Sequence, residues 1–297
     1  MQGIREYNRK ISSLGNTRKI TSSMKMISNV KMKKYAKLAT NSSPWWLASR
    51  EIISDAYFVI RKYLPLFVKG YPEVKKNLIY VCSGDQGLCG SYNSRVNNTA
   101  LGLAEKLSSQ GQEVVFSVIG AKSHQFFRRR AMIIFKARDK FISKMSMDSI
   151  DGITEEIINS YKTGLCQSVW FVHTRRISSV VFEPVAWQIL PLTEELVGKK
   201  KKNRDYDEDE NLPLIDASPL SLAEYTIKEY LRAFIHNALI ESSLSEHSSR
   251  STAMDAATNS CNRMINHYTQ LRNRARQAAI TSELSEIITG KESLECA

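Results

Sequence analysis

Cysteine is scarce and scattered in this sequence of 297 residues, which argues against the protein classes that depend on it. The five cysteines form no CxxC pair, so neither a disulfide framework nor a zinc site is indicated, and free thiols are expected. Long apolar runs are also lacking, because stretches such as Val114–Ala121 fall far short of the roughly 20 residues of a membrane span. Met1–Ile11 has no apolar core and no small-residue cleavage site, so no secretory signal is expected.

Recognisable catalytic patterns are lacking as well. The five histidines do not cluster, and neither HExxH nor GxSxG occurs. A phosphate-binding loop would sit at Ser83–Ser91, between a predicted strand and a predicted helix, but its glycines are spaced three apart and match neither GxGxxG nor a P-loop. A tight strand-to-helix turn is the simpler interpretation. No catalytic residue, cofactor site or metal ligand is therefore expected.

Positive charge is abundant. The chain has 42 Lys and Arg against 30 Asp and Glu, a formal net charge of +12, which favours an acidic partner. The excess is concentrated in Met1–Thr40, where Glu6 is the one acidic residue. A nucleic acid and an acidic protein surface both fit this pattern, although the shortage of aromatic residues there disfavours base stacking.

Residues 1–64 have the pattern of a long basic helix. Apolar residues recur three and four apart, which predicts a coiled-coil seam at Ile4, Tyr7, Ile11 and Leu14 and again at Ile20, Met24 and Ile27. The six-residue gap between Leu14 and Ile20 predicts local over- or underwinding. Pro44 predicts a kink or a restart, because proline in a helix interior costs roughly 3 kcal/mol.

Residues 74–197 alternate between strand and helix patterns, which predicts an α/β domain with at least partly parallel pairing. The predicted strands are Asn77–Cys82, Glu113–Gly120, Met132–Phe135, Ser168–Thr174 and Ser178–Pro184. The predicted helices are Asn93–Ser109, Lys122–Arg130 and Ile150–Tyr161. Ser178–Leu192 resembles an antiparallel edge or hairpin.

Residues 198–216 form a predicted linker, because the charge run Gly198–Asn211 is self-cancelling. Residues 217–297 then begin a helix at Ser218-Pro219, with no stop signal before Gly290. Its predicted seam has unbroken 3-4 spacing and comprises Met254, Ala257, Cys261, Met264, Tyr268, Leu271, Ala275 and Ala278. The expected fold is a long antiparallel coiled coil of the two terminal helices, flanking a Rossmann-like α/β domain.

Four segments resemble the gamma-subunit family of F-type ATP synthases. Ile20-Thr-Ser-Ser-Met-Lys-Met-Ile resembles ITxxMxMV, and Gly87-Leu-Cys-Gly-Ser-Tyr-Asn resembles GLCGGFN. Arg250-Ser-Thr-Ala-Met-Asp-Ala-Ala-Thr resembles RMxAMxxAT, and the segment from Asn273 to Ile287 resembles the C-terminal signature NxARQAxITxELxEI. The segments occur in the family's order. Two positions depart from the pattern, since Gln86 stands where the family usually has Arg and Ser91-Tyr92 replaces Gly-Phe.

The resemblance implies a non-catalytic rotor shaft that turns inside a hexamer of three alpha and three beta subunits. Its α/β base would contact the epsilon subunit and the membrane-embedded ring of c subunits. It further implies a peripheral protein on the cytoplasmic side of a bacterial inner membrane, associated with the membrane only through the complex.

The resemblance also implies residue roles. Arg276 and Gln277 would contact a loop of a beta subunit, with Arg250 and Met24 in the same bearing region. Thr281 and Glu283 would be coupled across the coil to Met24–Lys25. The positive side chains expected to face an acidic beta-subunit segment are Arg9, Lys10, Lys31, Lys33 and Lys34.

Two other functions remain open at this level. A basic coiled-coil nucleic-acid-binding protein would bind DNA or RNA with steep salt dependence. A Rossmann-type nucleotide enzyme would bind nucleotide at Ser83–Tyr92.

Overall fold

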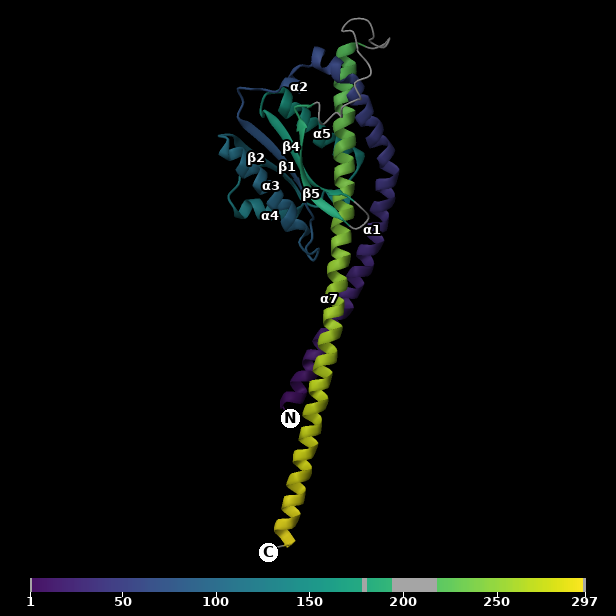
Figure 1. Ribbon diagram of the computed structural model, residues 1–297, viewed down its shortest axis with the longest axis vertical. Coiled ribbons are helices and arrows are strands. Elements are labelled where there is room, and N and C mark those ends of the chain that lie inside the picture. The colour runs from purple at the N-terminus through teal and green to yellow at the C-terminus, as the bar shows by residue number, and fades with distance from the viewer. Residues whose placement is uncertain (1, 178–180, 194–217, 296–297) are drawn as a thin grey trace. The chain divides into compact units, whose positions relative to one another are not determined.

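The computed structural model describes residues 2–177, 181–193 and 218–295 (Figure 1). The chain divides into two compact units. The coil unit comprises residues 1–29 and 250–297, and the sheet unit comprises residues 30–249. The predicted linker 198–216, with its charge run, lies outside the described residues, as do Cys296 and the first three residues of the predicted strand Ser178–Pro184.

The sheet unit is built around a five-stranded sheet with the order β3-β2-β1-β4-β5. The strands are β1 (Lys76–Cys82), β2 (Glu113–Ile119), β3 (Ile134–Arg138), β4 (Ser168–Arg176) and β5 (Phe182–Leu190). β1 runs parallel to both β2 and β4, and β2 runs parallel to β3. β5 is antiparallel to β4 at the edge. The predicted α/β layer and the predicted antiparallel edge are therefore confirmed.

Alternating side chains of the central strand supply two hydrophobic cores, one on each face of the sheet. Leu78, Tyr80 and Cys82 of β1 belong to one core, which also contains buried residues of α1, α5 and α7. Ile79 and Val81 belong to the other, beneath α3 and α4 (Figure 1). The helices are α1 (Gln2–Tyr63), α2 (Leu66–Lys69), α3 (Tyr92–Ser109), α4 (Ala121–Arg129), α5 (Met147–Lys162) and α7 (Pro219–Glu295), with a short 3₁₀ turn at Ile142–Lys144.

Strand β3 begins later than predicted. The apolar run Met132–Phe135 indicated its position, but the strand covers Ile134–Arg138 and ends in charged residues. Arg138 fits in the strand because its guanidinium donates to Ser117 Oγ at 3.2 Å and to Glu156 Oε2 at 2.7 Å. A periodicity argument cannot detect a charged strand residue whose partner lies elsewhere in the chain.

Helix α1 is continuous through Pro44, so the predicted restart is wrong. Buried residues continue on both sides of the proline, with Ala39 and Ser42 before it and Ser49 and Ile53 after it. Aromatic side chains reinforce the pairing with α7, because Trp46 contacts Tyr230 and Phe234 with ring centroids 5.7 Å apart. This packing offsets the missing backbone hydrogen bond.

Helix α7 runs without a break through the serine-rich segment Ser242–Ser251, which confirms the predicted helix. Ser242, Ser243 and Ser245 are almost completely buried. Ser243 Oγ donates to the carbonyl of Leu239 at 2.7 Å, one turn earlier. The Ser243 hydroxyl can therefore be buried without an unpaired donor, because it bonds to its own helix. The Ser245 hydroxyl is buried without a hydrogen-bond partner among the described residues.

Candidate functional site

The two helices of the coil unit are joined by polar contacts in an antiparallel register. Lys25 Nζ donates to Asp255 Oδ1 at 2.6 Å, and the hydroxyls of Thr21 and Thr258 lie 2.7 Å apart. Tyr7 contacts Tyr268 farther along, with ring centroids separated by 6.2 Å. The lower-numbered α1 residue thus faces the higher-numbered α7 residue, as antiparallel pairing requires.

These contacts correct the predicted seam. The first helix keeps a 3-4 spacing after Leu14 by placing polar residues at seam positions, with Thr21 and Ser28 both buried. Ile20 and Ile27 instead point outward and are 60% and 57% exposed. The prediction of over- or underwinding came from a gap between apolar residues, and it rested on the assumption that only apolar residues occupy seam positions. Short hydroxyl side chains can also fill the space between closely packed helices.

The seam of α7 differs in the same way. Met254 and Cys261 are buried as predicted, but Met264 is 51% exposed. Ala257 is half-buried, and the neighbouring Thr258 also contributes to the seam, since its hydroxyl faces Thr21.

The residues expected to contact partners differ widely in exposure. Arg250 is only 3% exposed, whereas Arg276, Gln277, Thr281 and Glu283 are all exposed. Met24 is half-buried, and the Lys25 side chain remains 40% exposed beside Asp255.

The structure does not bring Thr281 and Glu283 into contact with Met24–Lys25, so the coupling that the resemblance implies would not be a direct contact. Lys25 pairs with Asp255, which lies about seven helical turns before Thr281 at 3.6 residues per turn. The Thr281 hydroxyl instead donates to the Gln277 carbonyl of its own helix at 3.0 Å.

The end of α7 carries an exposed apolar stripe. Tyr268 already faces Tyr7, so α7 continues beyond the start of α1, as Figure 1 shows within the coil unit. Four apolar residues at i, i+4, i+7 and i+8 spacing lie on one face of this extension. They are Ile280, Leu284, Ile287 and Ile288, which are 49–68% exposed. The C-terminal signature contains Ile280, Leu284 and Ile287, but their exposure follows from the register of α7 on α1.

The basic residues singled out on α1 are all exposed. In the coil unit, Lys10 pairs with Glu6 at 2.7 Å, one turn away. In the sheet unit, Lys31, Lys33 and Lys34 form no ion pair with any residue in the described ranges. These three lysines therefore present unneutralised positive charge on one stretch of α1.

The loop after β1 is the strand-to-helix turn that the glycine spacing suggested. Gly90 has a φ of +58°, which a glycine adopts without strain. Asp85 Oδ1 accepts hydrogen bonds from the backbone N–H groups of Ala121, at 3.1 Å, and Lys140, at 2.7 Å. Asn93 Oδ1 accepts from the Gly84 N–H at 2.9 Å. Backbone N–H groups that a bound phosphate could use are therefore engaged by side chains of this chain.

The same loop is covered by Glu246 of α7, a residue that the sequence analysis missed. Its carboxylate lies against Gly84, where a Cβ atom would come within 2.7 Å of Glu246 Cδ and within 3.0 Å of both oxygens. Glu246 is 6% exposed. No local signal could reveal this contact, because the two residues lie far apart in the sequence.

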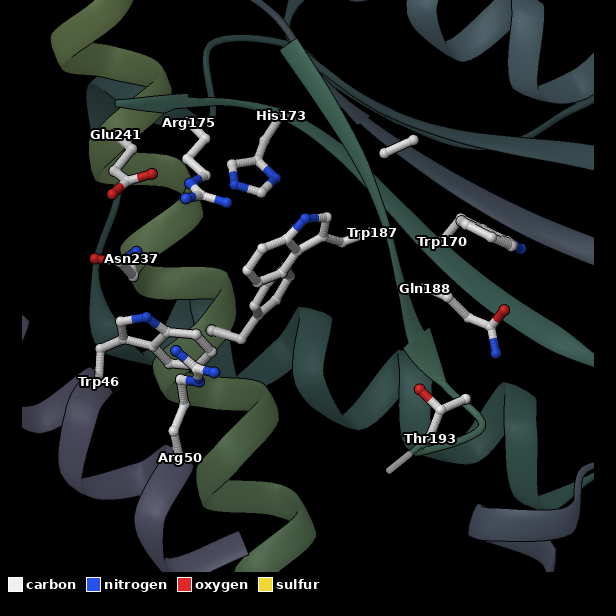
Figure 2. A pocket seen from close by; sticks show the side chains of 12 residues that line it. Trp46, Arg50, Trp170, His173, Arg175, Trp187, Gln188, Thr193, Asn237 and Glu241 are labelled. Atoms are coloured by element: carbon white, nitrogen blue, oxygen red, sulfur yellow. The ribbon is translucent and has the colours of Figure 1, made fainter. Parts of the chain in front are cut away.

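A pocket of about 780 Å³ lies in the sheet unit between the long helices and β5. Figure 2 shows Trp46 and Arg50 of α1 and Glu241 of α7 on the side opposite Trp187 of β5. Trp187 stacks on Phe234 of α7 with ring centroids 5.9 Å apart. This aromatic cluster packs both helices against the edge of the sheet.

Burial is the main cause of the pKa shifts of the titratable groups at this pocket. Burial lowers the pKa of His173 to about 4, so its imidazole is neutral at pH 7. Burial also raises the pKa of Glu241. Arg50 lies over the ring of Trp46 and Arg175 over the ring of Trp187, each at 5.8 Å from the ring centroid.

The cysteines are free thiols, as expected, since Cys82, Cys89, Cys166 and Cys261 are all free and buried.

The observed features define a class of protein. Two long helices pair in an antiparallel coil, one of them projects an apolar stripe beyond the pair, and a carboxylate of α7 lies against Gly84 at the end of β1 in the α/β domain. These are the features of a helical shaft subunit with an α/β base. No helix in the described part of the chain is long and apolar enough to cross a membrane.

Comparison with known proteins identifies the family. The model of the ATP synthase family matches residues 3–294. The chain is 34% identical to the ATP synthase gamma chain of Caldicellulosiruptor saccharolyticus over 293 residues, which covers 96% of this chain and 97% of the relative. It is 33% identical to that of Halothermothrix orenii over 297 residues, covering 99% and 100%. The chain therefore belongs to the gamma-subunit family of F-type ATP synthases, whose members are non-catalytic.

Solved structures show the same fold. The Tetrahymena thermophila mitochondrial ATP synthase, solved as its central stalk and c-ring, contains a chain that matches with a TM-score of 0.61 and 18% identity. The match covers 80% of this chain and 99% of that one. A chain of the Euglena gracilis mitochondrial ATP synthase matches with a TM-score of 0.64 and 15% identity, covering 98% and 94%.

Proposed function

We propose that this chain is the rotor shaft within a complex of three alpha and three beta subunits. The exposed end of α7 carries this proposal, because a stripe formed by Ile280, Leu284, Ile287 and Ile288 on an otherwise mostly polar end of the helix needs an apolar partner. A surrounding ring of subunits supplies such a partner at every rotational angle. The C-terminal signature and the relatives' names support the same assignment.

The proposed rotor function also implies partners for the α/β domain. The α/β domain would meet the epsilon subunit and the c-ring, so that proton flow through the membrane sector drives ATP synthesis at the beta sites. The chain would be a peripheral protein on the cytoplasmic side of a bacterial inner membrane, held there by the complex. The proposed domain limits are residues 1–64, 74–197, 198–216 and 217–297.

The partner contacts are proposed residue by residue. Arg276 and Gln277 are exposed within the extension of α7, where they can donate hydrogen bonds to a beta-subunit loop. Met24, Lys25, Arg250, Thr281 and Glu283 would complete the bearing. The positive side chains Arg9, Lys10, Lys31, Lys33 and Lys34 would face an acidic beta segment. Because exposed charge pairs are individually weak, that contact can form and break during rotation.

The first test is the subunit composition of the tagged chain purified from its native membranes, measured by native mass spectrometry. One copy per three alpha and three beta subunits is expected. Recovery of the chain alone or with nucleic acid, while the host's synthase stays intact, would overturn the proposal and favour the nucleic-acid-binding alternative.

The second test concerns Arg276 and Gln277. Replacing both with alanine removes hydrogen-bond donors from the helix surface without touching the coil seam. ATP-driven proton pumping should fall in the assembled complex while subunit stoichiometry stays normal. Arg263→Ala is the matched control, since Arg263 is an exposed arginine of the same helix that lies before the extension. Unchanged pumping in the Arg276→Ala, Gln277→Ala complex would count against this contact.

A further inference from the structure

The crevice at the carboxyl ends of the parallel strands contains a residue with no assigned role. Chain order reverses at β1, which has β2 on one side and β4 on the other. Doubly wound sheets typically bind ligands at such a switch point. Here the carboxylate of Glu246, from α7, occupies the space over Gly84 at the end of β1. The sheet is thus joined to the long helix at the place where other proteins of this architecture hold a ligand.

Buried polar groups surround this contact. Ser242, one turn before Glu246, accepts a hydrogen bond from the Thr174 N–H of β4 at 3.3 Å. Cys82, at the end of β1, has its pKa raised to about 12, chiefly by burial, and the nearby Glu246 charge contributes in the same direction. Glu246 and Ser242 therefore attach one face of α7 to two central strands.

The position of Glu246 along α7 makes this attachment mechanically important. The sheet unit ends at Ser249, so Glu246 is within one turn of the point where α7 leaves it. Farther back, α7 is held by apolar packing and by ion pairs such as Lys162–Glu224 and Lys228–Glu155. Apolar packing is non-directional, and exposed ion pairs contribute little to stability. A buried carboxylate in a closely fitting site instead specifies a single register of the helix on the sheet.

We propose that Glu246 is a positioning residue of the rotor, which locks α7 to the α/β domain where the helix leaves that domain. Torque applied to the domain then passes into α7 and is not lost as slippage between helix and sheet. Gly84 is the matching half of the lock, because any side chain there would displace the carboxylate. The inference rests on the proposed rotor function.

A double-mutant cycle in the assembled complex tests the lock. Glu246→Ala removes the carboxylate, and Gly84→Ala pushes it out of place. Each variant should lose proton pumping per ATP hydrolysed, while native mass spectrometry still shows one copy per three alpha and three beta subunits. In the double variant, Gly84→Ala should cause no further loss, because the shortened side chain leaves room for the new methyl group.

Chemical rescue gives a readout that general destabilisation would not produce. Acetate matches the atoms removed by Glu246→Ala, so it should restore pumping in that variant, whereas chloride at equal ionic strength should not. Glu224→Ala is the control, since it removes an exposed glutamate of the same helix that also contacts the α/β domain.

The outcomes separate the two proposals. If the unmodified chain does not assemble with alpha and beta subunits, the rotor function fails. If it assembles and the two single variants pump normally, the lock is wrong. Additive losses in the double variant would also overturn it. If the Glu246→Ala variant fails to assemble, the Gly84→Ala variant still tests the proposal, because normal proton pumping by the complex that contains Gly84→Ala would refute the lock.

Discussion

Glu156 joins three elements of the sheet unit through a single carboxylate. Its Oε1 accepts from the Tyr80 hydroxyl at 2.8 Å, and its Oε2 accepts from Lys136 and Arg138, both at 2.7 Å. Burial raises the pKa of Glu156, but the three donors outweigh it and hold the pKa below the ordinary value of 4.5. The charged form is therefore favoured by folding, which links α5 to β1 and β3.

Glu156→Gln should destabilise the chain in a pH-dependent manner. Because folding lowers the pKa, the contribution of Glu156 is complete above about pH 4.5 and is lost as the pH falls through the folded-state value. The free energy of unfolding should fall by about 1.5–3 kcal/mol at pH 7, and this difference should shrink below pH 4.5. Urea unfolding between pH 3 and 7 measures it, with exposed Glu105→Gln as control. A difference independent of pH would contradict the assignment.

At the scale of elements, α1 shows how packing overrides a local signal. Pro44 cannot donate a backbone hydrogen bond, yet the helix continues from Gln2 to Tyr63. The proline is exposed, so its ring faces away from α7, while Ser42 and Trp46 on either side contribute to the packed face. The helix thus tolerates a residue that its own backbone disfavours, because tertiary contacts on the opposite face supply the stability.

Pro44→Ala should stabilise the chain. Alanine restores the missing N–H donor and has the highest helix propensity, so the free energy of unfolding should rise by about 1–3 kcal/mol. Urea unfolding monitored by circular dichroism measures the change, with exposed Lys37→Ala in the same helix as control. Equal or lower stability would show that the proline is already accommodated without cost.

At the scale of the whole molecule, the net charge of +12 is unevenly placed. Lys31, Lys33 and Lys34 lie on α1 without acidic partners among the described residues, whereas Lys136 and Arg138 of the sheet share the single carboxylate of Glu156. Unpaired charges on a long helix attract an acidic surface at a distance and accelerate its encounter.

Removing these three charges should slow assembly with the alpha and beta subunits. The Lys31→Gln, Lys33→Gln, Lys34→Gln variant should assemble more slowly at low salt, with a weaker dependence on ionic strength. Stopped-flow or native-gel assembly kinetics between about 20 and 300 mM salt would measure this, a range over which screening changes strongly.

The matched control removes the same charge elsewhere. Arg128, Arg129 and Arg130 are exposed at the end of α4 and directly after it, and their replacement by glutamine changes the net charge equally. Equal slowing in both triple variants would show that net charge alone, and not the α1 surface, controls assembly.

The sequence by itself determined the elements, the order of blocks and the family. Runs such as Glu113–Ile119 are strands because branched apolar side chains recur locally, and the segment from Asn273 to Ile287 identifies the family without any contact. Tertiary structure decided which polar residues are buried. Thr21 replaces Ile20 in the seam, and Glu246 contacts Gly84, from which it is separated by more than half the length of the sequence. A local sequence pattern shows only whether one face of a helix or strand is mostly polar or mostly apolar. A buried polar group, in contrast, is stable only where a partner, often distant in the sequence, forms a hydrogen bond with it.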